Sequence, residues 1–349
     1  MRSPAALLLL AALTAIGVDC GGEPVSDGPT VDAARDTKKE VAVEQDVGVD
    51  TPDPSGPPYP IVLCHGMGGF GTLKGLPITY FNGIRDDLAA HGEAQVFTTL
   101  VPPYDGSENR ATALAPQIDE ILKKTGKAKV NLIGHSQGGM DIRLLASPAG
   151  KGYGDRIASI TTIATPHRGS QVADVTLKIL SPSGGFSFDD IANGLLKVLE
   201  RSVYEIDSDP NLKAQILQLS EHFMTTEFNP KYIDDPRVSY FSYGGRTNGL
   251  DGHADCDDAL YPDDSSKLDD PQVFLAPTAG FLQQGSLKKP NDGLVTVQSA
   301  KWGSFLQCVP ADHMSEVGQL DLTGPDPRSG FYHLEFFRLV VSRLRDRGL

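Results

Sequence analysis

A serine lies between glycines in the stretch GHSQG, residues 134–138. The apolar, β-branched run before it, residues 129–133, favours a strand, and residues 136–146 have the spacing of a helix. A sharp turn between strand and helix exposes a serine hydroxyl, and flanking glycines avoid side-chain collisions there. Ser136 is therefore a candidate nucleophile, and a serine that merely caps the helix is the alternative.

A nucleophilic serine needs a base, and the base needs a carboxylate that orients it. Where such an elbow follows a buried strand, the order along the chain is serine, acid, histidine. His313 lies in the loop ADHMSEVGQ, whereas His333 lies in the amphipathic stretch FYHLEFFRLVV and favours packing. His313 is the predicted base. The other histidines lie in glycine turns, end a helix or precede any plausible acid: His65, His91, His135, His167, His222 and His253.

The candidate acid lies between the serine and the histidine. Asp292, in PNDGLV, occupies a turn between two apolar runs. A polar loop holds four other aspartates that favour solvated surface. Asp292 is the predicted acid, and its alternative role is that of a turn-forming residue. The four aspartates set aside are Asp251, Asp255, Asp257 and Asp258.

Attack by a serine on an acyl carbon also needs hydrogen-bond donors for the oxyanion that forms. The backbone N–H of Gln137 follows the serine directly. The N–H of Met67, in HGMGG after the first apolar run, would supply the second donor. Both donors belong to the main chain, so the side chains there carry little information. HGMGG could also be simply a tight glycine turn.

These residues need elements that bring them to one edge of the fold. Apolar runs alternate with helical patterns, which predicts an α/β fold with a mainly parallel sheet and right-handed crossovers. The predicted strands are residues 59–64, 94–100, 129–133, 157–164 and 238–243, and the predicted helices are 78–91, 112–124 and 136–146.

One stretch is too long for a plain crossover. Residues 170–229 are dominated by amphipathic helical patterns such as 191–203 and 212–223. We expect this segment to form a helical lid over the carboxyl edge of the sheet.

The N-terminus carries the pattern of export. The apolar run 5–18 fits a signal peptide and is too short to span a bilayer. Residues 1–20 are therefore a predicted signal peptide, and Cys20 is either a lipid anchor of a bacterial surface lipoprotein or lies beside a plain secretory cleavage site. Residues 21–58 contain many acids and no aromatic residue, which predicts a disordered linker.

The catalytic domain is predicted to span residues 59–349. The formal net charge of −14 argues against nucleic acid as a partner. Three cysteines lie beyond Cys20. Cys64 ends an apolar run and is expected to be buried, while Cys256 and Cys308 could pair if the chain is exported.

The motifs occur in an order that belongs to a known family. From residue 59 to the C-terminus the chain resembles the secreted bacterial triacylglycerol lipases of the Pseudomonas and Burkholderia type. The resemblance rests on YPIVLCHGMGGF, VNLIGHSQGG, TPHRGS, FNPKY, NDGLV and HMSEVGQ.

The resemblance implies an α/β-hydrolase fold, a helical lid and hydrolysis of long-chain esters. It maps nucleophile, acid and base onto Ser136, Asp292 and His313, and the oxyanion donors onto Met67 and Gln137. An esterase, a polyester depolymerase or a phospholipase on the same scaffold is the alternative, and a surface binding protein on an inactivated fold is a remote one. The sequence does not decide whether a foldase partner is needed.

The resemblance also implies a calcium ion near the histidine loop, and here the chain departs from its relatives. The family has an aspartate two residues after the histidine, where this chain has Ser315. A second ligand before the acid loop would be Asp269 or Asp270. Asp312 and Glu316 could compensate, although both are expected to be solvated loop charges. Because calcium prefers carboxylate oxygen, we expect no required cofactor and at most weak calcium binding.

Overall fold

The computed structural model describes residues 53–72, 78–179, 210–247, 271–283, 289–319, 324–327 and 329–349. Six parallel strands form one sheet in the order β2-β1-β3-β4-β5-β6. A parallel α/β sheet is the predicted fold class, and it is confirmed. The strands are β1 (Ile61–Cys64), β2 (Val96–Thr99), β3 (Val130–His135), β4 (Ile157–Ile163), β5 (Ser239–Gly245) and β6 (Ser304–Val309).

The central strands are buried on both faces, as their nearly continuous apolar sequences predict. Every residue of β1, β3 and β4 is buried. In the register of these strands, Cys64 pairs with Gly134 at the carboxyl edge of the sheet. The turn that carries Ser136 therefore starts beside the end of β1.

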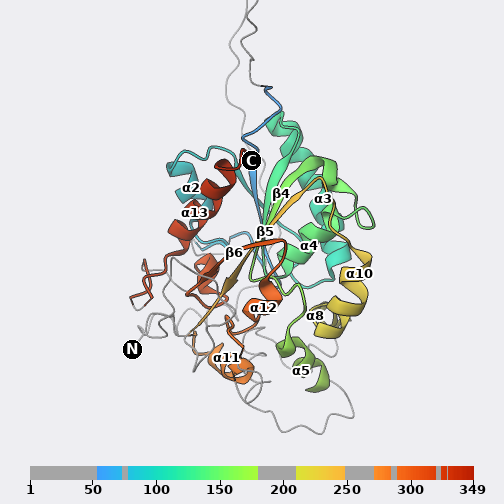
Figure 1. Ribbon diagram of the computed structural model, residues 1–349, viewed down its shortest axis with the longest axis vertical. Coiled ribbons are helices and arrows are strands. Elements are labelled where there is room, and N and C mark those ends of the chain that lie inside the picture. Colours follow the sequence, from blue (N-terminus) through green and yellow to red (C-terminus); the bar gives the residue numbers. More distant parts are fainter. Residues whose placement is uncertain are drawn as a thin grey trace, which may run out of the picture.

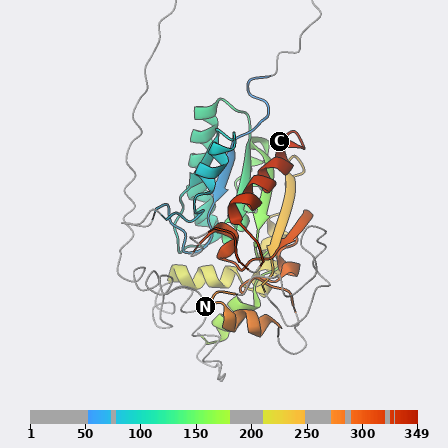
Figure 2. The same ribbon diagram turned by 90° about the vertical axis from the view of Figure 1, so that its left-hand side faces the viewer.

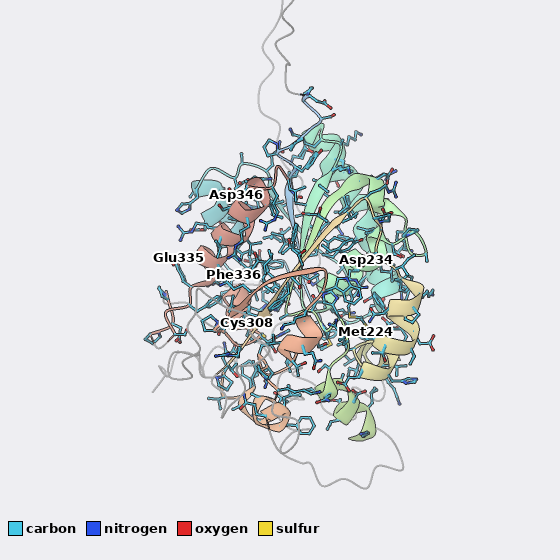
Figure 3. All side chains as sticks on the ribbon, viewed as in Figure 1. Met224, Asp234, Cys308, Glu335, Phe336 and Asp346 are labelled. Atoms are coloured by element: carbon cyan, nitrogen blue, oxygen red, sulfur yellow. The ribbon has the colours of Figure 1, made fainter. Side chains whose placement is uncertain are left out.

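Helices cover both faces of the sheet (Figure 1). One face packs against α2 (Ile84–Ala90) and α13 (His333–Arg345), and the other against α3 (Ser107–Thr125) and α4 (Gln137–Ala146). Figure 3 shows Phe336 on the side of α13 that faces the sheet, with Glu335 on the outer side. Burial of this apolar stripe, at about 25 cal/mol per Å² of apolar surface, is what fixes α13 on the sheet.

A further group of helices lies beyond the carboxyl edge of the sheet (Figures 1 and 2). These are α5 (Gln171–Ile179), α8 (Pro210–Gln218), α11 (Ala276–Gln283) and α12 (Val297–Ala300). Apolar side chains of α5, α8 and α11 share one cluster. The predicted lid, 170–229, is thus described at both flanks, whereas residues 180–209, with the predicted helix 191–203, lie outside the described residues.

Several boundaries differ from the prediction. The helix expected over 78–91 begins at Ile84, because Gly83 adopts a positive φ of 68° just before it. α3 begins at Ser107, five residues before the predicted start. The helix expected over 212–223 ends at Gln218, and Ser220 caps a new one by accepting a hydrogen bond from Phe223 N–H. The short elements are η1 (Tyr153–Arg156), α9 (Glu221–Phe223), a π-helix (Met224–Phe228), α10 (Asn229–Lys231) and η4 (Ser315–Val317).

Strand β6 is missing from the prediction altogether. It is the last strand of the sheet, and its residues are buried only from Gln307 onward. Its sequence, SFLQCV, is therefore not a continuous apolar run like those of the inner strands, and the run-based prediction did not detect it.

The predicted signal peptide, Cys20 and nearly all of the linker fall outside the described residues. Cys64 is a buried free thiol, as expected. Cys308 is disulfide-bonded, while its predicted partner Cys256 is not among the described residues. Among the described helices, none has the length and apolar character needed to cross a membrane.

Candidate active site

Ser136 lies at the turn between β3 and α4 with φ 55° and ψ −131°. A positive φ is uncommon for a residue other than glycine, and such strain persists only where surrounding contacts hold it. The N–H of Ser136 donates to the carbonyl of Ile163 on β4, at 2.9 Å. Ser136 occupies the N-cap position of α4, yet its side chain makes no capping hydrogen bond. The helix-cap alternative is therefore wrong, and the hydroxyl is free to face the cleft.

The glycines of the turn are required by close packing. A Cβ on Gly138 would lie 2.3 Å from the carbonyl oxygen of Cys64. A Cβ on Gly134 would lie 2.7 Å from the backbone nitrogen of Gly139, and a Cβ on Gly139 2.0 Å from Oγ1 of Thr165. Any larger residue would push α4 away from the end of β1, so these contacts fix the position of Ser136.

His313 and Asp292 come together from two separate loops. Nδ1 of His313 lies 2.8 Å from Oδ2 of Asp292. The other carboxylate oxygen, Oδ1, accepts hydrogen bonds from the N–H groups of Leu294 and Val295 at 2.8 and 2.7 Å. Asp292 is fully buried and His313 nearly so. β6, which the sequence did not predict, carries the chain to His313.

Ser136 and His313 line one cleft at the carboxyl edge of the sheet. The cleft encloses about 460 Å³, including space open to solvent. Its walls are apolar, and their side chains include Met67, Val172, Ala173, Ile216, Leu219 and Leu294. The hydroxyl of Ser136 and the imidazole of His313 thus share the cleft, and the carboxylate of Asp292 contacts the imidazole. These three groups suit acyl transfer to and from a serine.

The loop of Met67 is held by a buried arginine that the sequence analysis did not single out. Nη2 of Arg110 donates to the carbonyl oxygens of His65 and Gly66 at 2.7 and 3.2 Å, and its Nε pairs with Asp141 at 2.8 Å. Burial raises the pKa of Asp141, and the arginine opposes that shift. Arg110 lies four residues before Leu114 on the buried stripe of α3. An arginine on an otherwise apolar helix stripe is unusual, and this is the sequence feature that could have pointed to it.

Comparison with known proteins places the chain in a family. Residues 59–231 match the model of the alpha/beta hydrolase fold. A triacylglycerol lipase of Vibrio cholerae is 33% identical over 301 residues, which covers 83% of this chain and 89% of the relative. One of Pseudomonas fragi is 38% identical over 308 residues, covering 83% and 97%. The chain belongs to the triacylglycerol lipase family.

Solved structures agree on the fold of this lipase. A Staphylococcus hyicus lipase matches with a TM-score of 0.56 at 19% identity, covering 82% of this chain and 95% of the other. A lipase of Bacillus licheniformis in its mature form matches with a TM-score of 0.53 at 22% identity, covering 79% and 91%.

Behind the histidine of the lipase lies a second acidic residue. Glu316 is fully buried, and its Oε2 lies 3.2 Å from Nε2 of His135, whose Nδ1 lies 2.6 Å from the hydroxyl of Tyr80. The rings of His135 and His313 are 4.6 Å apart. Burial, with the charge of Asp292 next, holds the pKa of Glu316 well above its usual range. Burial also lowers the pKa of His135 well below its usual range, so burial disfavours a charge on either member of this pair.

The expectation that Glu316 and Asp312 are solvated is wrong, because both are fully buried. Asp312 accepts hydrogen bonds from the N–H groups of Met314, Ser315 and Gln272 at 3.0, 2.8 and 2.8 Å. Asp312 is therefore a hydrogen-bonded residue of the loop interior and not a solvated charge.

The remaining proposed calcium ligands, Asp269 and Asp270, lie outside the described residues. Within the described part of the chain, His135, His313 and Glu316 bring potential ligand atoms within 4.8 Å of one another. His313 is the residue that pairs with Asp292 and lines the cleft with Ser136, so this group of atoms overlaps the site already described.

Proposed function

We propose that the protein is a serine lipase that hydrolyses long-chain acylglycerols through an acyl-enzyme on Ser136. The observation that carries the proposal is that Ser136 and His313 line the same apolar cleft. The Ser136 side chain makes no helix-capping hydrogen bond and its φ is positive, and His313 pairs with Asp292. Relatives named triacylglycerol lipase at 33% and 38% identity support the substrate class.

In the proposed reaction, Nε2 of His313 takes the proton of the Ser136 hydroxyl as its oxygen attacks the ester carbonyl. Asp292 accepts the Nδ1–H of the imidazole and stabilises its positive charge. The N–H groups of Met67 and Gln137 donate to the oxyanion. The alcohol then leaves with the proton from His313, and water hydrolyses the acyl-enzyme by the same steps.

No step in this reaction needs a metal or a cofactor. We propose that Asp312 and its three N–H donors hold the histidine loop, near which the resemblance implied a calcium ion.

The proposed site of action is outside the cell, as a secreted protein or a lipid-anchored surface protein. The apolar run 5–18, Cys20 and the acidic linker 21–58 support export. Metabolic labelling with palmitate, compared between the parent and Cys20→Ser, separates the two forms: label in the parent alone indicates an anchor.

Two measurements test the proposed activity. The first is hydrolysis of p-nitrophenyl esters from two to eighteen carbons, with emulsified triglyceride alongside. A preference for long chains and turnover of triglyceride are expected; activity on short esters alone would indicate an esterase instead. The second is labelling by a fluorophosphonate, which Ser136→Ala should abolish and Ser170→Ala, in the same cleft, should preserve. An unlabelled parent would exclude a serine hydrolase.

A further inference from the structure

Helix α8 reaches the nucleophile turn through one buried side chain. Gln215 is fully buried, and its Nε2 donates to Oε1 of Gln137 at 2.6 Å. The same Nε2 donates to the carbonyl oxygen of Pro103 at 3.2 Å. Gln137 is the residue whose backbone N–H is proposed to bind the oxyanion.

The orientation of these two carboxamides follows from their partners. Nε2 of Gln137 donates to the carbonyl oxygen of Asp105 at 3.0 Å, so its Oε1 must face Gln215. Because a carbonyl oxygen only accepts, Pro103 also requires the NH₂ group of Gln215 on its side. Both N–H bonds of Gln215 are therefore used, and its Oε1 is buried without a hydrogen-bond partner in the described part of the chain. A buried unpaired acceptor costs free energy. The orientation in which Gln215 donates to Gln137 and Pro103 therefore carries this cost.

Pro103 connects Gln215 to the other half of the oxyanion hole. Its carbonyl oxygen also accepts the N–H of Gly68 at 2.9 Å, and Gly68 directly follows Met67. One carboxamide thus contacts the side chain of Gln137 and the carbonyl that anchors the Met67 loop.

Residues that follow Gln215 form part of the cleft wall. Ile216, on α8, and Leu219, directly after its last residue Gln218, line the cleft together with Ser136. An acyl chain that packs on these two side chains presses on the helix that holds Gln215.

We propose that Gln215 is a positioning residue for the oxyanion hole: it sets the two backbone donors at Met67 and Gln137 and links them to the acyl-binding wall of α8. The inference rests on the proposed function. Oxyanion donors act only when they are aimed at the oxygen in the transition state, so a small displacement lowers kcat more than it changes KM.

The chain offers a matched control on the same helix. Gln218 lies three residues after Gln215, accepts from Ser107 N–H at 2.7 Å and donates to Glu108 at 2.9 Å. It binds the start of α3 and contacts neither oxyanion residue through these bonds.

The experiment compares Gln215→Leu with Gln218→Leu, using p-nitrophenyl butyrate and a long-chain ester. We expect Gln215→Leu to lower kcat about tenfold on both, with KM nearly unchanged, because misplaced donors cost up to ~100-fold. Gln218→Leu should keep kcat within about twofold, although its melting temperature falls.

A second variant gives a readout that stability alone would not move, and it serves if Gln215→Leu does not fold. Gln215→Glu presents an acceptor to Gln137 and Pro103 when ionised, but an O–H donor when protonated. Burial raises the pKa of such a carboxyl group. The ratio of its kcat to that of the parent should therefore fall as the pH rises from about 5 to 8.

Equal kcat values for the parent and Gln215→Leu, or a Gln215→Glu ratio that does not change with pH, would overturn the inference while leaving the proposed function intact. Inactivity of the parent itself would refute the proposed function first.

Discussion

The turn that carries Ser136 and the loops that carry Asp292 and His313 are built in different ways. The turn is a contiguous stretch in which the backbone is tightly packed. A Cβ added at Gly134 or Gly138 would lie less than 3 Å from neighbouring backbone atoms. The loops come from segments 21 residues apart and are held by hydrogen bonds to buried carboxylates. The turn cannot accept added atoms, whereas the loops cannot accept a change in charge or hydrogen bonding.

The two carboxylates beside His313 show the same contrast within the loops. Asp292 accepts two backbone N–H bonds through Oδ1, and its Oδ2 lies 2.8 Å from Nδ1 of His313. Oε2 of Glu316 lies 3.2 Å from Nε2 of His135, and its Oε1 is buried with no hydrogen-bond partner among the described residues. Of these two carboxylates, Asp292 is the one that contacts the His313 ring nitrogen and is held in place by backbone N–H donors.

The prediction with the largest expected effect tests whether His313 or His333 is the base for Ser136. His313→Ala should lower kcat/KM by about 10⁵-fold, since the base of a serine hydrolase acts as one unit with its nucleophile. His333→Ala removes the bond to the carbonyl of Asn82 at 2.9 Å and should leave kcat/KM within about threefold while lowering the melting temperature. Ester kinetics with both purified variants settle the assignment. A strong loss of kcat in His333→Ala alone would reverse it.

The second prediction tests the packing of the turn. Gly138→Ala should destabilise the protein by about 2–4 kcal/mol or prevent folding, because its Cβ would collide with the Cys64 carbonyl at 2.3 Å. Gly280→Ala, in α11, is the control: no atom lies within 4 Å of the added Cβ, so a small gain of up to ~1 kcal/mol is expected. Urea unfolding of both variants measures the difference. Equal stabilities would mean that the turn tolerates added bulk.

The third prediction tests the neutral state of Glu316. Its pKa is raised in the folded protein, so above about pH 4.5 the unfolded chain loses a proton that the folded protein keeps. The parent then loses about 1.4 kcal/mol of stability per pH unit until the folded pKa is reached. Glu316→Gln lacks this term, so its stability relative to the parent should rise with pH between 5 and 8.

Urea unfolding across that pH range measures this difference, and Glu335→Gln on the exposed side of α13 should show none. A parent that instead gains stability over Glu316→Gln as the pH rises would mean that Glu316 is ionised and paired.

The smallest expected effect concerns calcium. EDTA should change the melting temperature and activity of the parent little, because Asp312 is already occupied by three N–H donors and Ser315 replaces a carboxylate. Ser315→Asp should introduce stabilisation by added calcium, through binding to the folded state. Loss of parent activity in EDTA with recovery on calcium addition would show a functional ion at this loop.

The sequence by itself determined five of the six strands of the described sheet and the strand–turn–helix that carries Ser136. Buried strands such as β1, β3 and β4 are continuous apolar runs, and the turn is a local pattern whose glycines reflect contacts made within it and with β1. It also placed Asp292 and His313, because chain order and turn residues restrict the candidates. Strand β6 was not predicted, because an edge strand needs only partial burial and this one has no continuous apolar run.

Only the tertiary structure decided how the site is supported. Gln215, Asp312 and Glu316 look like ordinary polar residues in the sequence, whereas Arg110 carries a weak signal as an arginine on an apolar helix stripe; all four are buried beside the active site. Each has at least one partner far away along the chain, such as Asp141 for Arg110, 31 residues away, or His135 for Glu316, 181 residues away. Burial and long-range hydrogen bonding leave no periodic signal in the sequence, since they are set by which surfaces meet once the elements pack.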